Sequence, residues 1–217
     1  MEELFLKSLL IVCAYLLGSV PTAVWVGKFF YGIDIRDHGS GNAGATNTFR
    51  VLGKKAGIPV FIIDVAKGYM AVRLSFWLVL LNPGTDPFIN FQLLLGVAAF
   101  IGHLFPVFAG FRGGKGVATL FGVVLALHSF AALISIGIFI IVLLISKYVS
   151  LSSIIAGITF PILIIFVFPV TTESLLIFSV LIATLLILTH QKNIGRLLRK
   201  EESKVYLIRK DRPINKN

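Results

Sequence analysis

Charged residues are scarce in this chain. Only 14% of its 217 residues are Asp, Glu, Lys or Arg, whereas 57% are hydrophobic. A soluble domain carries nearer a quarter of charged residues, so the mean hydropathy of +0.93 indicates a large surface that faces lipid. This composition excludes an ordinary soluble protein. It predicts a single domain, residues 1–217, with an all-α fold: a bundle of membrane-spanning helices.

Cysteine is almost absent as well. The one cysteine, Cys13, lies in an apolar run and excludes an intrachain disulfide. His and Cys residues do not cluster with the spacing of metal ligands, so we expect no metal and no other cofactor. The apolar run 4–26 is too long for a cleavable signal and lacks a small-residue cleavage pattern after it, so we expect it to be the first span.

Apolar runs place the expected spans. A bilayer core of about 30 Å needs roughly 20 apolar residues per helix. Five runs approach that length: 4–26, 58–81, 91–108, 151–170 and 175–188. A further run, 117–145, is too long for one helix and short for two full spans. His128 and Ser129 lie near its middle and predict a turn there.

Positive charge sets the expected topology, because cytoplasmic loops collect Lys and Arg. The basic segments are 28–55, 112–115, Lys147 and 192–216. Placing all four segments in the cytoplasm requires the chain to cross the membrane twice between residues 115 and 147, so the run 117–145 must form two helices. The prediction is seven transmembrane helices, with the N-terminus outside, the C-terminus cytoplasmic and a basic cytoplasmic tail from about residue 192. Six spans, the alternative, would leave Lys147 outside.

The net charge of +10 also bears on partners. Cytoplasmic positive charge orients a membrane protein and meets anionic lipid headgroups. We therefore expect membrane lipid as a partner and no nucleic acid, and no obligate protein partner is evident.

The first basic loop, 39–50, combines three glycines with small polar side chains and ends in an arginine. Glycines let backbone N–H groups approach a ligand, hydroxyl and amide groups donate, and Arg offers a fork for phosphate. The glycine spacing does not indicate dinucleotide binding, because no strand precedes it. A flexible turn is the alternative to a phosphate site. The predicted phosphate-binding residues are Ser40, Gly41, Asn42, Thr46, Asn47 and Arg50.

The second basic loop contains Gly113, Gly114, Lys115 and Gly116. Gly116 stands where a nucleotide-binding P-loop has Ser or Thr, so the pattern does not support ATP binding. A lysine among glycines at the start of a helix nevertheless attracts anions. We predict a second phosphate site here, with a simple positive-inside anchor as the alternative.

Other polar residues lie at the expected inner ends of spans. Asp64 and Lys67 are three residues apart and can pair on one helix face, as a structural brace or as support for the site. His103 is equally compatible with a core or a site role. His190 and Asn193 are one helical turn apart and can point at the same spot.

The loop 39–50, the stretch 110–119 and residues 190–193 together resemble the bacterial acyl-phosphate:glycerol-3-phosphate acyltransferase family. The resemblance extends to about Leu198. It implies transfer of a fatty acyl group from long-chain acyl phosphate to the sn-1 hydroxyl of glycerol-3-phosphate, giving lysophosphatidic acid and phosphate. This is the first acylation of phospholipid synthesis, in the bacterial cytoplasmic (inner) membrane, with the active site on the cytoplasmic face.

The resemblance also implies roles for individual residues. Arg50 and Lys115 would bind phosphate groups, and Ser153, His190 and Asn193 would surround the acceptor. Ser150 and Ser152 lie close to Ser153, so the choice among these three serines stays open. The hydroxyl proton could go to a substrate phosphate or to His190; the apolar neighbours of His190 at i−4 and i+4 favour the phosphate.

Two other functions remain in view. A transporter of organic phosphate would use similar basic loops, but it would place polar residues at mid-depth along several spans. A membrane scaffold would explain the hydrophobicity but not the glycine-rich loops.

Overall fold

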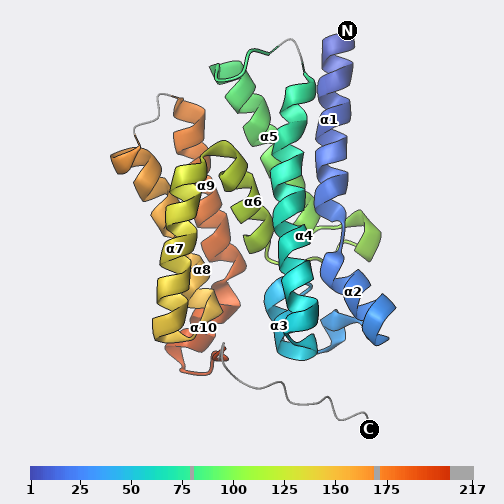
Figure 1. Cartoon of the computed structure of the whole chain (residues 1–217), viewed down its shortest axis with the longest axis vertical. Coiled ribbons are helices and arrows are strands. Elements are labelled where there is room, and N and C mark those ends of the chain that lie inside the picture. Colours follow the sequence, from blue (N-terminus) through green and yellow to red (C-terminus); the bar gives the residue numbers. More distant parts are fainter. Residues whose placement is uncertain (79–80, 169–171, 206–217) are drawn as a thin grey trace.

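The computed structural model describes residues 1–78, 81–168 and 172–205, and this part of the chain is helical, without strands. Helices α1 to α5 form one half of the molecule, α7 to α10 form the other, and α6 lies between them (Figure 1). The predicted all-α class is confirmed. The α-helices are α1 (Glu2–Ser19), α2 (Thr22–Tyr31), α3 (Ala45–Leu52), α4 (Lys54–Arg73), α5 (Asp86–Leu104), α6 (Val117–Leu127), α7 (Ser129–Ser146), α8 (Val149–Ile162), α9 (Glu173–Thr189) and α10 (Gln191–Leu198).

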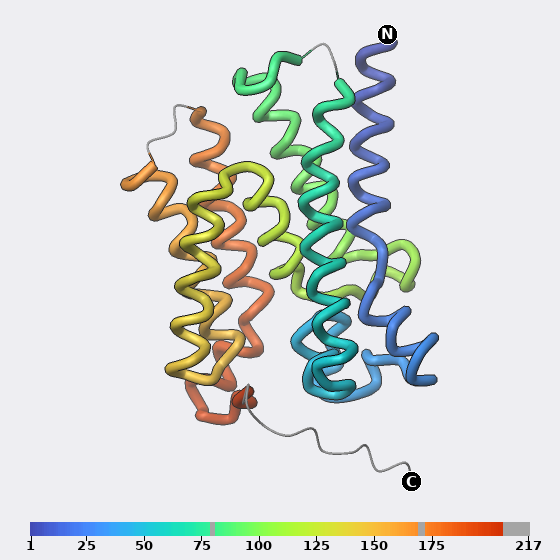
Figure 2. The backbone as a smooth tube through the Cα atoms, in the orientation of Figure 1, coloured from blue at the N-terminus to red at the C-terminus, as the bar shows by residue number. Residues whose placement is uncertain are grey.

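Four short helical turns complete the described part of the chain. They are the 3-10 helices η1 (Ile35–Asp37), η2 (Leu74–Trp77) and η3 (Val107–Ala109), and the π-helical η4 (Leu163–Val167) that extends α8. The short helices α2, α3 and α10 gather at the end of the bundle opposite the N-terminus (Figures 1 and 2). The start of the first basic loop connects α2 and α3 at that end.

The first apolar run is not one straight helix. It breaks at Val20 and Pro21, and α1 and α2 are bent by 43° relative to each other. Proline lacks the N–H that would continue the helical hydrogen-bond ladder, which explains the break. The predicted turn in 117–145 is confirmed, because α6 ends at Leu127 and α7 begins at Ser129. The ring nitrogen of His128 there accepts a hydrogen bond from the Ala131 N–H and caps α7.

Within the described residues, three helical segments are long and apolar enough to cross a membrane by themselves: 86–109, 129–146 and 149–167. The number rises to five if the bent pairs α1–α2 and α9–α10 each form one span. Helix α4 fails this test of composition because it contains five charged residues, and α6 has only 11 residues. At 1.5 Å per residue, α6 is roughly 16 Å long, about half a bilayer core.

Glycines set the place of α6. A Cβ atom at Gly68 of α4 would lie 2.1 Å from the carbonyl oxygen of Thr119 in α6. A Cβ atom at Gly122 of α6 would lie 2.0 Å from the carbonyl oxygen of Val65 in α4. The two backbones therefore touch, as small residues allow in membrane proteins. This contact fixes the start of α6, and with it the lysine that precedes the helix.

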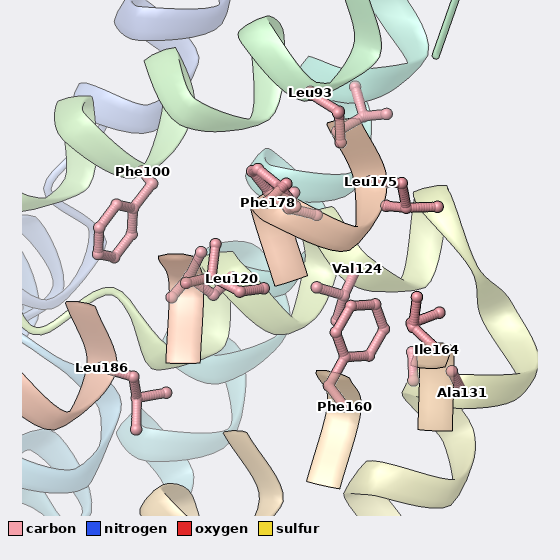
Figure 3. Close-up of a cluster of buried hydrophobic side chains, with 14 of the residues drawn as sticks. Leu93, Phe100, Leu120, Val124, Ala131, Phe160, Ile164, Leu175, Phe178 and Leu186 are labelled. Carbon is pink, nitrogen blue, oxygen red and sulfur yellow. The ribbon is translucent and has the colours of Figure 1, made fainter. Parts of the chain in front are cut away.

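A cluster of apolar side chains joins α5 and α6 to the second half (Figure 3). Because lipid is as apolar as these side chains, close packing rather than removal of water holds them together. The residues labelled in Figure 3 are Leu93, Phe100, Leu120, Val124, Ala131, Phe160, Ile164, Leu175, Phe178 and Leu186.

Candidate active site

A cavity of about 810 Å³ lies between the two halves of the bundle. Its polar part is lined by residues of the two basic loops and of the turn between α9 and α10. Its apolar part is lined by α6, α7, α8 and α9, including Phe121, Phe139, Phe160 and Ile182. A polar chamber joined to an apolar groove suits a ligand with an anionic head and a hydrocarbon chain.

Most of the predicted site residues line this one cavity. Those that do are Ser40, Gly41, Asn42, Thr46, Asn47, Arg50, Asp64, His103, Gly114, Lys115, Gly116, Ser150, Ser153, His190 and Asn193, whereas Lys67, Gly113 and Ser152 lie outside its lining.

Asn47 holds the first loop in shape. Its side-chain oxygen accepts a hydrogen bond of 2.9 Å from the backbone N–H of Ser40. Its side-chain NH₂ donates to the carbonyl oxygens of Ile35 and His38, both at 3.0 Å. The residue is 1% exposed, so these contacts occupy its amide. This geometry favours a role in shaping the loop over direct contact with phosphate.

Arg50 points its charge where a ligand can reach it. The residue is exposed and lines the cavity. With the residues that the structure describes, its guanidinium makes neither a hydrogen bond nor an ion pair. Ser40 and Thr46 are likewise exposed at the cavity. The first loop therefore offers an open fork and two hydroxyl groups.

The second loop is pressed against the end of α5. The N–H groups of Gly113 and Gly114 donate to the carbonyl oxygens of Leu104 and His103, at 3.1 and 3.2 Å. These two glycines therefore direct their N–H groups at the protein itself. Gly116 has a φ of 78°, and a Cβ atom there would lie 2.2 Å from the ring of Phe100. The glycines thus serve close approach, and the side chain of Lys115 carries the charge.

Lys115 connects the second loop to the C-terminal region. Its ammonium donates to the side-chain oxygen of Asn193, and the Asn193 NH₂ donates to Glu202 at 2.7 Å. The Glu202 carboxylate also accepts from Ser150 at 3.0 Å and from Arg196 at 2.6 Å. This network brings together three segments that are far apart in the sequence: Lys115, Ser150 and residues 193–202.

Glu202 belongs to the candidate site, and sequence reasoning missed it. It follows α10 in the basic tail, and it lines the cavity with a side chain only 6% exposed. The tail offers no apolar periodicity that would predict its folding back. The signal in the sequence is an acidic residue within a basic segment, and this does not predict which side chains the residue contacts. Its contact with Ser150 spans 52 residues and appears only in three dimensions.

His190 is 3% exposed and lies at the turn between α9 and α10. Its Nδ1 is 2.8 Å from the carbonyl oxygen of Leu186. Because a carbonyl only accepts, Nδ1 carries the proton and Nε2 is left as an acceptor. The side chain at i−4 is apolar and cannot orient the His190 ring, but the backbone carbonyl of the same residue, Leu186, does so. Among the serines, the Ser153 hydroxyl donates to the carbonyl of Val149 at 2.8 Å, and its oxygen keeps capacity to accept.

Asp64 and Lys67 form the predicted ion pair, at 2.8 Å. Asp64 also accepts a hydrogen bond from the Thr22 hydroxyl at 3.1 Å, and the Lys67 ammonium donates to the carbonyl oxygen of Val20 at 2.9 Å. Both charges therefore hold the break between α1 and α2. His103 lies 3.9 Å from Asp64 and extends this buried network to the cavity.

Burial lowers the pKa of Lys115 to about 8. The nearby Glu202 carboxylate raises it, while the charges of Arg196 and Arg50 lower it further. Burial alone would raise the pKa of Glu202, but hydrogen bonds from Asn193, Arg196 and Ser150 outweigh this effect and hold it below its usual range. The cavity thus holds an excess of positive charge, as an anion site requires. No group of three or more His, Cys, Asp or Glu residues that could hold a metal ion occurs in residues 1–78, 81–168 and 172–205.

Comparisons with known proteins identify the family of this chain. Residues 8–200 match the family described as glycerol-3-phosphate acyltransferase. A protein of that name from Salinibacter ruber is 42% identical over 91% of this chain and 92% of its own length. One from Chlorobaculum tepidum is 43% identical over 93% of this chain and 97% of its own length. One from Listeria monocytogenes serotype 4b is 46% identical over 91% and 96%.

Two solved structures are also similar, both of PlsY, an integral membrane glycerol 3-phosphate acyltransferase. The glycerol 3-phosphate form has a TM-score of 0.81 and 38% identity, covering 92% of this chain and 96% of that one. The lysophosphatidic acid form has a TM-score of 0.79 and 36% identity, covering 92% and 95%. The family resemblance of the three motifs is confirmed, and with it an integral membrane fold. This chain belongs to the glycerol-3-phosphate acyltransferase family.

Proposed function

We propose that this enzyme transfers a fatty acyl group from long-chain acyl phosphate to the sn-1 hydroxyl of glycerol-3-phosphate, releasing lysophosphatidic acid and phosphate. The single observation that carries the proposal is the cavity, which joins a cationic chamber to an apolar groove. Both substrates are anionic, and the donor also has a hydrocarbon chain. Solved relatives with glycerol 3-phosphate and with lysophosphatidic acid support the choice of acceptor and product.

Positioning of two anions is the main task of the site. In this proposal Arg50, with Ser40, Asn42 and Thr46, binds one phosphate group. Lys115 lines the same cavity and binds the other. Holding both groups together opposes their repulsion and brings the hydroxyl next to the acyl carbon, which is worth several powers of ten in rate.

The acceptor lies near the turn between α9 and α10 in the same proposal. His190 Nε2 accepts a hydrogen bond from a hydroxyl of glycerol-3-phosphate, and Asn193 and Ser153 help to orient it. The Leu186 carbonyl supports this role, because it fixes the ring with Nε2 as an acceptor. Asp64 and Lys67 support the site by holding the break between α1 and α2, and His103 lies beside Asp64.

The chemistry needs no covalent intermediate, since acyl phosphate is already an activated mixed anhydride. The hydroxyl oxygen attacks the acyl carbon, the bond between that carbon and the phosphate oxygen breaks, and phosphate leaves with the electron pair. We assign the hydroxyl proton to a phosphate oxygen of a substrate. An imidazolium at His190 would face the ammonium of Lys115, which supports the phosphate as the base.

The proposed topology has seven spans in a single domain, with the N-terminus outside and a basic C-terminal tail in the cytoplasm. It adds α4 and α6 to the five candidate spans. The charges of α4 that exclude it by composition include Asp64 and Lys67, which are paired and buried, and a short α6 can lie inside the bundle. The site then opens at the cytoplasmic face of the bacterial inner membrane, in contact with lipid.

An assay with the purified protein tests the proposal. Glycerol-3-phosphate and palmitoyl phosphate should yield phosphate and 1-acyl-glycerol-3-phosphate in equal amounts, as measured by mass spectrometry and NMR. Glycerol serves as the control acceptor and should not react, because it lacks the phosphate that the cavity binds. Acylation of glycerol at a similar rate, or acylation of the sn-2 hydroxyl, would contradict the proposed site.

A further inference from the structure

Arg36 joins the two basic loops, although its place in the sequence indicates only a positive charge. It lies in η1, just before the first loop. Its Nη1 donates to the carbonyl oxygen of Ala109 at 2.7 Å and to that of Arg112 at 3.4 Å. Its Nε and Nη2 donate to the Asp34 carboxylate at 2.9 and 2.7 Å. The side chain is only 13% exposed.

The short helix η1 is firmly attached to the first loop. The Asn47 side chain binds the carbonyl oxygens of Ile35 and His38, on either side of Arg36, and the N–H of Ser40. Asp34 caps η1 by accepting from the Arg36 N–H at 3.0 Å. Ile35 is fully buried. The backbone that carries the Arg36 side chain is therefore fixed relative to Ser40 and the loop that follows.

The turn 109–112 comes before the two glycines that bond to the end of α5, and the N–H groups of its last two residues bond within the segment 106–112. Gly110 and Phe111 both adopt a left-handed backbone, with φ values of 62° and 58°, and this conformation is unfavourable for a residue other than glycine. The Phe111 side chain is 59% exposed, so it does not hold the loop by packing inside the protein. The carbonyl groups that Arg36 binds flank this strained turn and lie three to six residues before Lys115.

We propose that Arg36 is a positioning residue that couples the two phosphate-binding loops, holding Lys115 in register with the first loop. The inference deepens the proposed function and rests on it for the claim that the loops bind phosphate. Only the planar fork of arginine can bind a carboxylate on one side and carbonyl groups on the other. A lysine has one point charge on a flexible stem and cannot keep both sets of contacts.

The test measures phosphate binding by the full-length protein in detergent, as the rise of its melting temperature with inorganic phosphate. In Arg36→Lys, the phosphate concentration for a half-maximal rise should be about tenfold higher. Asp34→Asn, which removes the carboxylate that orients the fork, should shift it in the same direction by less. Arg112→Gln is the matched control, since it removes a charge from the same loop but keeps the carbonyl group, and should stay within about twofold of the unmodified protein.

Each outcome decides the inference. An unchanged phosphate requirement in Arg36→Lys overturns it, and so does an equal loss in Arg112→Gln, which would mean that the effect is not specific to the contacts of Arg36. If Arg36→Lys does not fold, Asp34→Asn decides by the same criterion. Failure of the unmodified protein to respond to phosphate would also overturn it, because the two coupled loops would then not bind phosphate. Turnover with acyl phosphate is measured separately. If the variants shift the phosphate requirement as expected but the unmodified protein shows no turnover, the proposed reaction is refuted and the role of Arg36 stands.

Discussion

The alkaline limb of the pH–rate profile should report Lys115. Burial lowers the pKa of this ammonium from 10.5 to about 8, so its charge is present below about pH 8 and is lost as the pH rises further. The pH dependence of kcat/KM reports groups of the free enzyme. One pH unit above the pKa, about a tenth of the molecules keep the charge on Lys115. We therefore expect kcat/KM for the substrate whose phosphate Lys115 binds to fall about tenfold by pH 9.

Two variants should move this limb in opposite directions. Lys115→Arg keeps a charged group at all accessible pH values, so any remaining activity should persist to about pH 10. Glu202→Gln removes a carboxylate that raises the pKa of Lys115, so the limb should move below pH 8. Glutamine can still accept and donate hydrogen bonds near Asn193 and Ser150, which limits the change to charge.

The assay is the initial rate with purified protein from about pH 6 to about pH 10, with each substrate varied in turn. At saturating substrate the limb should weaken, because bound phosphate favours the charged ammonium. The Lys115→Arg profile also controls for ionisation of the substrates. A limb near pH 8 that is unchanged in both variants would refute the assignment of this charge to phosphate binding.

Three further results are expected. Arg50→Ala and Lys115→Ala should nearly abolish turnover, since each leaves a phosphate charge without its partner, a loss of about 2–5 kcal/mol; activity within about threefold of the unmodified protein would contradict two phosphate sites. His190→Asn should mainly raise the KM for glycerol-3-phosphate and keep the acidic limb of the profile, whereas a loss of turnover of ~10²–10⁴-fold together with that limb would identify a general base. In a Cys13→Ser background, single cysteines at the positions of Arg50, Lys115 and Asn193 should resist an impermeant reagent in intact cells, and rapid labelling at any of them would contradict the seven-span topology.

Local patterns predicted the helical class and several boundaries. The turn at His128 could be predicted because the apolar run around it exceeds the thickness of a bilayer. The pairing of Asp64 with Lys67 followed from helical spacing alone. The break at Val20 and Pro21 was not predicted, although proline was a signal for it, because the apolar run continues on both sides.

Long-range contacts explain what the sequence could not supply. Asn47 has the residue type of a phosphate ligand, but its amide is used by the backbone of its own loop. Arg36 looks like one more cytoplasmic charge, yet it reaches carbonyl groups about 70 residues further along the chain. Glu202 enters the site because the chain turns back after α10. Composition and local spacing do not predict contacts between residues so far apart in the sequence.

The most direct test of the proposed reaction is a comparison of acyl donors. The purified protein receives glycerol-3-phosphate with palmitoyl phosphate, palmitoyl-coenzyme A or palmitoyl-acyl carrier protein, and lysophosphatidic acid is quantified by mass spectrometry. The account predicts product with palmitoyl phosphate alone, in a one-to-one ratio with released phosphate. Product from either thioester at a comparable rate, or none from palmitoyl phosphate, would contradict it.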